Sequence, residues 1–171
     1  REDQIEEEIK NIVELIIKFY KVFNFNDVDI ELSTKPEKSM GSAAIWKKSE
    51  AILSKVLNDL KLKFKINKGD GAFYGPKIDF HVKDCIGRSW QCGTVQLDFL
   101  MPERFNLEYA DDLGQKIRPV MIHRTVMGSI QRFVGILIEH YAGAFPLWLS
   151  PVQVAILPIS DKHLDYAKQI K

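Results

Sequence analysis

The sequence is poor in cysteine, with only Cys85 and Cys92 among its 171 residues. They stand seven residues apart, which matches neither a CxxC metal pair nor the dense cysteine framework of a disulfide-rich domain. The pattern excludes a small secreted disulfide scaffold and favours a reducing compartment. We therefore expect a cytoplasmic protein.

The chain also lacks net charge and long apolar runs. It has 24 Lys and Arg against 23 Asp and Glu, so no global attraction to nucleic acid is expected and any such contact must be local. No apolar stretch is long enough to cross a bilayer, and no basic leader precedes one, so we expect no membrane association. The sequence starts at Arg1 without Met and stops inside an amphipathic run at Lys171, which we interpret as a fragment.

What is present is a mixture of two periodicities. Apolar residues at helical spacing predict helices at 5–23, 46–60 and 128–141. Apolar and polar residues alternate, as in strands, at 28–32, 64–67, 77–83, 89–99 and 118–125. Glycine-marked turns between the middle strands indicate an antiparallel meander. The expected fold class is α+β, an antiparallel sheet flanked by helices, and not an alternating parallel Rossmann pattern.

The composition changes after Gly143. Residues 145–151 are stiff and aromatic, and a β-branched run at 152–157 precedes a polar helical pattern. We interpret residues 1–149 as one domain and residues 150–171 as the first strand and helix of a second domain.

The glycine-rich stretch GDGAFYGPK, residues 69–77, holds the first candidate site. It matches neither the P-loop pattern GxxxxGK[ST] nor GxGxxG before a helix, and a tight hairpin turn explains its glycines equally well. Lys77 follows a rigid Gly-Pro pair, where a fixed cation could neutralise phosphate charge.

A polar stripe follows the strand predicted at 89–99. Strict alternation places Gln91 on one face of this strand and Cys92, Thr94 and Gln96 on the other. A buried amide without a partner costs about 1 to 3 kcal/mol, so the stripe needs protein partners or a ligand. A solvated sheet face is the alternative explanation.

Two further polar residues stand in apolar surroundings. A lone histidine in a strand, such as His123 in VMIHR, is more often a packed residue than a ligand, and one imidazole cannot hold zinc alone. Arg132 interrupts the apolar helical pattern 128–141. Its stem can cover apolar surface, or its guanidinium can reach a nucleotide from the helix start.

Five segments together resemble the threonyl-tRNA synthetase family. They are LSTKPEK at 32–38, GAFYGPK at 71–77, WQCGTVQLDF at 90–99, PVMIHR at 119–124 and FPLWLSPV at 145–152. Their order and spacing match along essentially the whole chain, and WQCGTVQLDF and PVMIHR are the most specific. The resemblance implies the later part of a class II synthetase catalytic domain for residues 1–149 and the start of an anticodon-binding domain for 150–171.

The resemblance also implies a site. In this family PVMIHR, the following Gly-Ser and a helical arginine form motif 3, and His123 matches the last of three ligands to a zinc that coordinates the amino and hydroxyl groups of threonine. The remaining implied roles are catalysis for Lys77 and Arg132, ATP or adenylate binding for Gln91, Thr94, Ser129 and Arg132, and threonine binding for Tyr74 and Gln96. We expect Lys77 and Arg132 to point into one cleft with Thr94 and Gln96.

The implied reaction joins threonine to ATP as threonyl adenylate and then transfers threonine to tRNA(Thr). Magnesium would accompany the ATP, and the parent protein would be a homodimer through motif 1. Motif 1, the motif 2 arginine and the other two zinc ligands belong to segments upstream of Arg1, so we expect the fragment alone to be inactive and to hold zinc loosely if at all. Gln131 replaces the usual motif 3 glutamate.

Two alternatives remain open at this point. A non-catalytic synthetase-like binding module would keep the fold and a pocket without aminoacylation. A seryl or prolyl relative fits less well, because His123 and the WQCGT strand match threonine selection.

Overall fold

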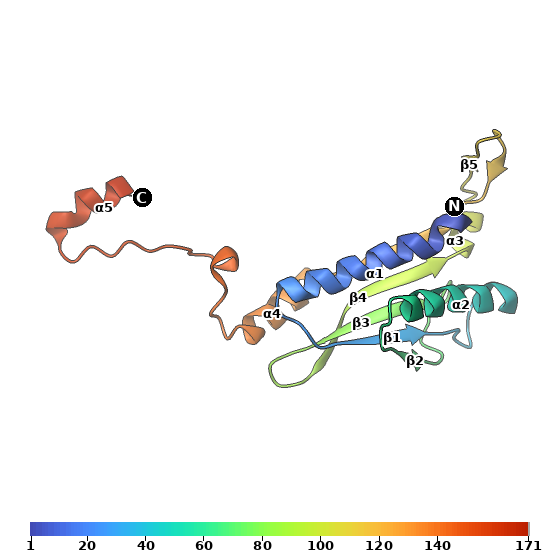
Figure 1. Cartoon of the computed structure of the whole chain (residues 1–171), viewed down its shortest axis with the longest axis horizontal. Coiled ribbons are helices and arrows are strands. Elements are labelled where there is room, and N and C mark those ends of the chain that lie inside the picture. Colours follow the sequence, from blue (N-terminus) through green and yellow to red (C-terminus); the bar gives the residue numbers. More distant parts are fainter. Residues whose placement is uncertain (171) are drawn as a thin grey trace.

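The computed structural model describes residues 1–170 and shows an α+β fold. A five-stranded sheet has the order β2-β1-β3-β4-β7, with α1 and α2 packed on one of its faces (Figure 1). The main elements are α1 (Ile5–Val22), β1 (Val28–Ser33), α2 (Ala43–Asp59), β2 (Lys65–Asn67), β3 (Lys77–Lys83), β4 (Ser89–Asp98), α3 (Leu100–Arg104), β7 (Met121–Thr125) and α4 (Ile130–His140). The predicted helices and strands of residues 5–141 are therefore confirmed, apart from small shifts of their ends.

Helix α1 buries one stripe against the sheet. Its buried residues recur every three or four positions, as the periodicity predicted, and they are Ile5, Ile9, Ile12, Val13, Ile16 and Tyr20. The charged residues between them face solvent, and the ion pair between Glu6 and Lys55 links α1 to α2. This packing makes α1 the cover of the apolar face.

Helix α2 begins three residues earlier than predicted. Ser42 caps it by accepting a hydrogen bond from the Ile45 amide at 3.3 Å, so the helix starts at Ala43 instead of Trp46. The serine sits in a small-residue segment, SAA, whose helical character an apolar periodicity does not reveal.

The predicted meander is wrong for the edge of the sheet. Strands β3 and β4 form an antiparallel hairpin and β1 pairs antiparallel with β3, but β2 runs parallel to β1, with Glu31 opposite Lys65. Parallel neighbours need a crossover connection, and α2 provides it between β1 and β2. The alternation of apolar and polar residues within a short strand does not indicate whether the neighbouring strand runs parallel or antiparallel to it.

Strand β7 is the edge of the sheet opposite β2, and helix α4 follows it along the chain. The Tyr20 hydroxyl donates to the Val126 carbonyl at 2.7 Å, which ties α1 to the turn between β7 and α4. Phe133 of α4 packs against Phe19 of α1 and against Phe23, the residue that follows α1, with ring centroids 5.6 and 5.4 Å away. These contacts fix the start of α4 near the end of the sheet.

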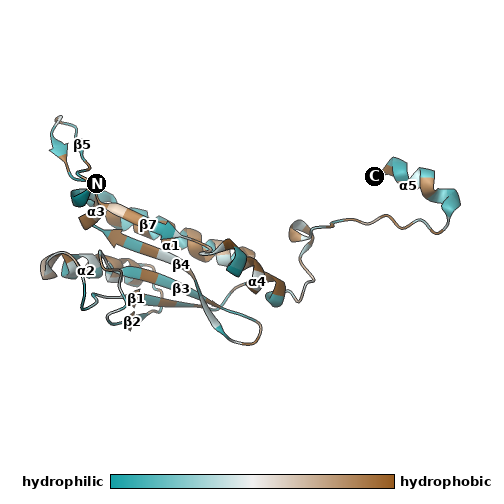
Figure 2. Ribbon diagram, turned by 180° about the vertical axis from the view of Figure 1, so that it is seen from behind, coloured by the Kyte–Doolittle hydropathy of each residue, from teal (hydrophilic) through white to brown (hydrophobic). Residues whose placement is uncertain are grey.

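In the last part of the chain the predicted helix is confirmed, but the predicted strand is not. Residues 150–170 extend away from the sheet and end in the short helix α5 (Leu164–Ile170), with hydrophobic residues left uncovered along the way (Figures 1 and 2). The β-branched run at 152–157 forms no strand, because a strand needs a hydrogen-bonded neighbour and residues 1–170 supply none there. Within the same residues, no helix has the length and hydrophobicity of a membrane span.

Candidate functional site

The sheet has a polar face opposite α1 and α2. Ile78, Phe80 and Val82 of β3 point into the core, so alternation turns Lys77 and Asp79 to the other side. The strand register then sets Gln96 and His123 in line with Lys77, and sets Thr94 and Thr125 in line with Asp79. A cavity of about 240 Å³ on this face is lined by Thr94, Gln96, His123, Arg124 and Thr125.

A β-bulge brings Gln91 onto this polar face. His81 pairs with Gln91 and Phe80 with Gly93, which leaves Cys92 as the extra residue of β4. The bulge reverses the alternation on either side of it, so Gln91 shares a face with Thr94, to which it donates a hydrogen bond at 3.1 Å. The expectation that Gln91 lies opposite Thr94 was wrong for this reason, and Cys92 is buried in the core.

A buried carboxylate organises the polar face. The side chain of Asp79 is 2% exposed, and it accepts hydrogen bonds from Ser33, Gln91 and Thr94 and pairs with Lys77 at 2.8 Å. Sequence reasoning missed Asp79, although an acidic residue inside the apolar strand KIDFHV was a usable signal, since such a group needs partners.

Lys77 is held between two carboxylates. Its ammonium lies 2.8 Å from Asp79 and 3.0 Å from Asp70. Burial lowers the pKa of Lys77, but the hydrogen bonds and charges of the two carboxylates outweigh burial and leave the pKa raised. The preceding Gly75 has no room for a side chain, because a Cβ would stand 2.1 Å from the Leu97 carbonyl oxygen. The cation is therefore fixed in place and remains charged at neutral pH.

Tyr74, Gln96 and His123 form a second polar group. The Tyr74 hydroxyl donates to Gln96 Oε1, and its ring centroid lies 5.3 Å from that of His123. Burial, and then the charge of Asp98, raise the pKa of Tyr74, so the hydroxyl keeps its proton as a donor. Among residues 1–170 the Gln96 amide nitrogen has no hydrogen-bond acceptor, so it can donate to a ligand.

His123 is oriented by a residue that sequence reasoning also missed. Its Nε2 lies 2.9 Å from Oδ2 of Asp98, whose side chain is fully buried. Oδ1 of Asp98 accepts from the amides of Leu100 and Met101 at 2.8 and 2.9 Å. Because a carboxylate accepts at both oxygens, Nε2 carries the imidazole proton and Nδ1 is the nitrogen left to bind a ligand.

Among residues 1–170, no hydrogen bond joins the side chains of Ser129 and Arg132 to these two groups. Ser129 caps α4 by accepting from the Arg132 amide at 3.4 Å, and its hydroxyl donates to Gln131 at 3.1 Å. The Arg132 guanidinium lies 5.8 Å from the ring centroid of Trp90. The expected cleft shared by Lys77, Arg132, Thr94 and Gln96 stays a prediction.

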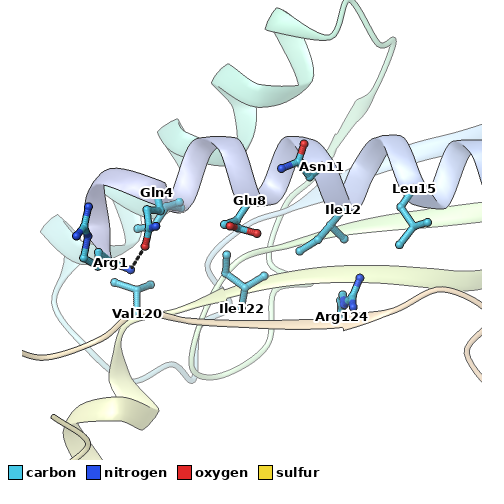
Figure 3. Close-up of a pocket in the computed structure, with 10 residues that line it drawn as sticks. Arg1, Gln4, Glu8, Asn11, Ile12, Leu15, Val120, Ile122 and Arg124 are labelled. Carbon is cyan, nitrogen blue, oxygen red and sulfur yellow. Dashed lines mark hydrogen bonds between the residues drawn. The ribbon is translucent and has the colours of Figure 1, made fainter. Parts of the chain in front are cut away.

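A larger cavity, of about 440 Å³, lies on the opposite side of the sheet between α1 and β7 (Figure 3). Apolar residues such as Ile12 and Ile122 line it together with Glu8 and Arg124. None of the predicted site residues faces this cavity, so the polar face remains the candidate site. No group of three or more His, Cys, Asp or Glu residues within the described part of the chain could hold a metal ion.

Comparison with known proteins gives one family for most of the chain. Residues 1–141 match the profile of the tRNA synthetase class II core domain (G, H, P, S and T). The threonine–tRNA ligase 2 of Bacillus subtilis is 58% identical over all 171 residues. Among solved structures, the RNA binding domain of threonyl-tRNA synthetase from Cryptosporidium parvum matches 98% of this chain and 42% of its own length, with a TM-score of 0.94 and 44% identity. A putative threonyl-tRNA synthetase from Aeropyrum pernix matches 98% of this chain and 41% of its own length, with a TM-score of 0.76 and 27% identity.

These relatives are much longer than the chain. The 171 residues cover 27% of the Bacillus subtilis protein, so the chain spans about a quarter of the length of the curated relatives it matches.

Proposed function

Because the chain belongs to the tRNA synthetase class II core domain family, we propose that it forms part of the site at which a threonine–tRNA ligase activates threonine with ATP. The observation that carries the proposal is the 58% identity to a threonine–tRNA ligase over the whole chain. The polar face supports it, since it combines a fixed cation, oriented amides and a histidine with a free nitrogen. The parent protein would then transfer threonine from the adenylate to tRNA(Thr).

The proposed chemistry needs no covalent nucleophile from the protein. The threonine carboxylate attacks the α-phosphate of ATP, the bond to pyrophosphate breaks, and threonyl adenylate forms. Lys77 and Arg132 would stabilise the negative charge that develops on the phosphate oxygens, and magnesium would accompany the ATP. Orientation of the two substrates supplies the rest of the acceleration.

The other residues divide between the two substrates. Gln91, Thr94 and Ser129 would contact the nucleotide. Tyr74 and Gln96, which lie beside His123, would contact threonine. The donor left on the Gln96 amide suits an oxygen of the amino acid.

His123 fits a zinc ligand, because its Nε2 is occupied by Asp98 and its Nδ1 is available. When bound, zinc would coordinate the amino and hydroxyl groups of threonine. Residues 1–170 offer no set of three ligands, so a complete zinc site would need residues from other parts of the parent protein.

Residues 150–171 would begin an anticodon-binding domain in a cytoplasmic, homodimeric parent protein. The uncovered Val152, Val154, Leu157 and Ile159, which are 72 to 98% exposed, fit a segment that packs in a larger domain.

Exchange of radioactive pyrophosphate into ATP tests the proposal. In the complete protein that carries this sequence, exchange should depend on threonine and be much slower with serine, proline or valine. Dependence on another amino acid would overturn the threonine assignment. Absence of exchange with every amino acid would favour the non-catalytic module.

A further inference from the structure

The Asp79 carboxylate has partners at both of its oxygens. Oδ1 accepts from the Gln91 amide nitrogen and from the Thr94 hydroxyl, the latter at 2.9 Å. Oδ2 accepts from the Ser33 hydroxyl at 2.9 Å and lies 2.8 Å from the Lys77 ammonium. Three hydrogen-bond donors and one cation thus surround the two oxygens of this buried carboxylate, which can only accept.

The arrangement fixes the direction of the hydrogen bonds on the polar face. A carboxylate can only accept, so the Gln91 amide must turn its nitrogen inward, and its second N–H goes to Thr94 Oγ1 at 3.1 Å. The Thr94 hydroxyl donates its one hydrogen to Asp79. What remains for a ligand is the Gln91 carbonyl oxygen and a lone pair of Thr94, which are both acceptors.

The same carboxylate anchors the cation. The side chain of Asp79 is 2% exposed, whereas that of Asp70, the other partner of Lys77, is 56% exposed. An anionic ligand can replace the exposed partner at Lys77 without disturbing the buried one. Asp79 thus keeps the Lys77 ammonium in place when the ligand replaces Asp70.

We propose that Asp79 is the positioning residue of the nucleotide site, an inference that rests on the proposed function. It sets Gln91 and Thr94 as acceptors for ligand hydroxyl or amino groups and holds Lys77 for phosphate. Asp79 itself does not touch the nucleotide. Its effect on ATP passes through the three side chains that it orients.

A double-mutant cycle tests the direction of the hydrogen bond between Asp79 and Gln91. Asp79→Asn turns an acceptor into an amide, and Gln91→Glu sets two carboxylates against each other, so each change alone should weaken ATP binding by about tenfold or more. In the double variant the new amide at position 79 can donate to the new carboxylate at position 91, whose outer oxygen is still an acceptor for the ligand. Titration of the complete protein with ATP should therefore show that the double variant binds ATP more tightly than whichever single variant has the lower ATP affinity.

Losses that simply multiply in the double variant would overturn the proposal. Leu53→Ala is the control for lost stability, because Leu53 is a fully buried residue of α2, on the face of the sheet opposite the polar face. It should lower the thermal midpoint without weakening ATP binding. An equal loss of ATP binding in this control, at an equal loss of thermal stability, would show that Asp79 is merely structural. If the Asp79→Asn variant does not fold, Gln91→Glu alone decides the matter, because it leaves Asp79 in place: an ATP affinity equal to that of the wild type would overturn the proposal.

The proposed function can fail separately. A wild-type protein that binds ATP but exchanges pyrophosphate with an amino acid other than threonine would overturn the threonine assignment and leave the ATP cycle intact. A wild-type protein that binds no ATP would overturn both.

Discussion

The two cysteines differ sharply at the residue scale. Cys92 is the bulge residue of β4, and burial raises the pKa of its thiol to about 11. Cys85 is exposed in the turn between β3 and β4.

Since the thiolate is the reactive form, iodoacetamide at pH 8 should modify Cys85 and spare Cys92 in the folded chain. Peptide mapping by mass spectrometry measures this. Modification of both cysteines at similar rates before unfolding would contradict the placement of Cys92, and both should react in guanidinium chloride.

A second prediction at this scale concerns the tautomer of His123 and rests on the proposed zinc site. Asp98→Asn keeps an oxygen for the Leu100 and Met101 amides but points an N–H at Nε2. The imidazole proton must then move to Nδ1, the nitrogen proposed to bind zinc. In the complete protein, zinc affinity should fall about 10- to 100-fold, and His123→Ala should abolish zinc retention.

Zinc content after dialysis against a chelator measures this effect. His163→Ala, in the exposed segment after residue 150, is the control and should keep its zinc. Full zinc retention by the Asp98→Asn variant would contradict the orienting role, and full retention by His123→Ala would remove His123 from the site.

The sequence revealed a site residue only where a short motif around that residue was informative by itself. Lys77, Gln96 and His123 were found because they stand out in motifs, whereas Asp79 and Asp98 matter through partners distant in sequence, such as Ser33. Hydrogen bonds across strands require the register, and the register was not known before the fold.

At the element scale, a glycine of β4 allows α1 to approach the sheet. A Cβ on Gly93 would stand 2.6 Å from the Tyr20 hydroxyl oxygen and 3.3 Å from Ile16. Tyr20 is completely buried, so its side chain cannot easily move away from an added methyl group. Gly93→Ala should therefore lower the free energy of unfolding by about 1 to 3 kcal/mol, as overpacked cores do.

Urea denaturation of the chain checks this prediction. Gly135→Ala is the matched control, because Gly135 lies on the exposed side of α4 and an added methyl group would find nothing within 4 Å. Alanine is the better helix former there, so the control should be neutral or stabilising by up to about 1 kcal/mol. Equal stability of the Gly93→Ala variant and the wild type would contradict the close packing of α1 on β4.

The hairpin between β3 and β4 should make stability depend on pH. Burial raises the pKa of Asp84, but donors from Trp90, Arg88 and the backbone outweigh it and lower the pKa to about 2. A carboxyl whose folded pKa lies below its unfolded value stabilises the fold above about pH 4, and this contribution disappears as the pH falls through about 2.

Thermal unfolding of the wild type and Asp84→Asn across this range measures the effect. The difference between their midpoints should be largest above about pH 4 and shrink towards about pH 2. A difference that stays constant over the whole range would show that the charge of Asp84 does not stabilise the hairpin.

The sequence predicted elements better than their pairing. Helix α1 and strands β1, β3 and β4 have local periodicities, so their positions followed from the residues alone. The parallel pairing of β2 and the bulge at Cys92 depend on which strand lies alongside, and alternation within one strand does not encode this.

At the scale of the whole molecule, the chain consists of a packed body and an extended end. Trp148 packs against the body, with its ring centroid 5.4 Å from that of Phe23. Between residues 151 and 170 only Ala167 is even half-buried. The predicted strand at 152–157 failed at this scale, because its hydrophobic residues find no partner among residues 1–170.

The stability of the body should therefore not depend on this end. A chain shortened to residues 1–149 loses no buried side chain, so its thermal midpoint should lie within about 2 °C of the original, since a change of 1 kcal/mol would move the midpoint by about 2 to 4 °C at this size. Limited proteolysis of the original chain should cut first between residues 150 and 160, where the residues are mostly exposed and outside helices and strands. Trp148→Ala is the control that removes a contact with the body, and it should lower the midpoint measurably. If the shortened chain melts several degrees lower while Trp148→Ala does not, residues 150–170 stabilise the body in solution, and their separation from it in the structure is wrong.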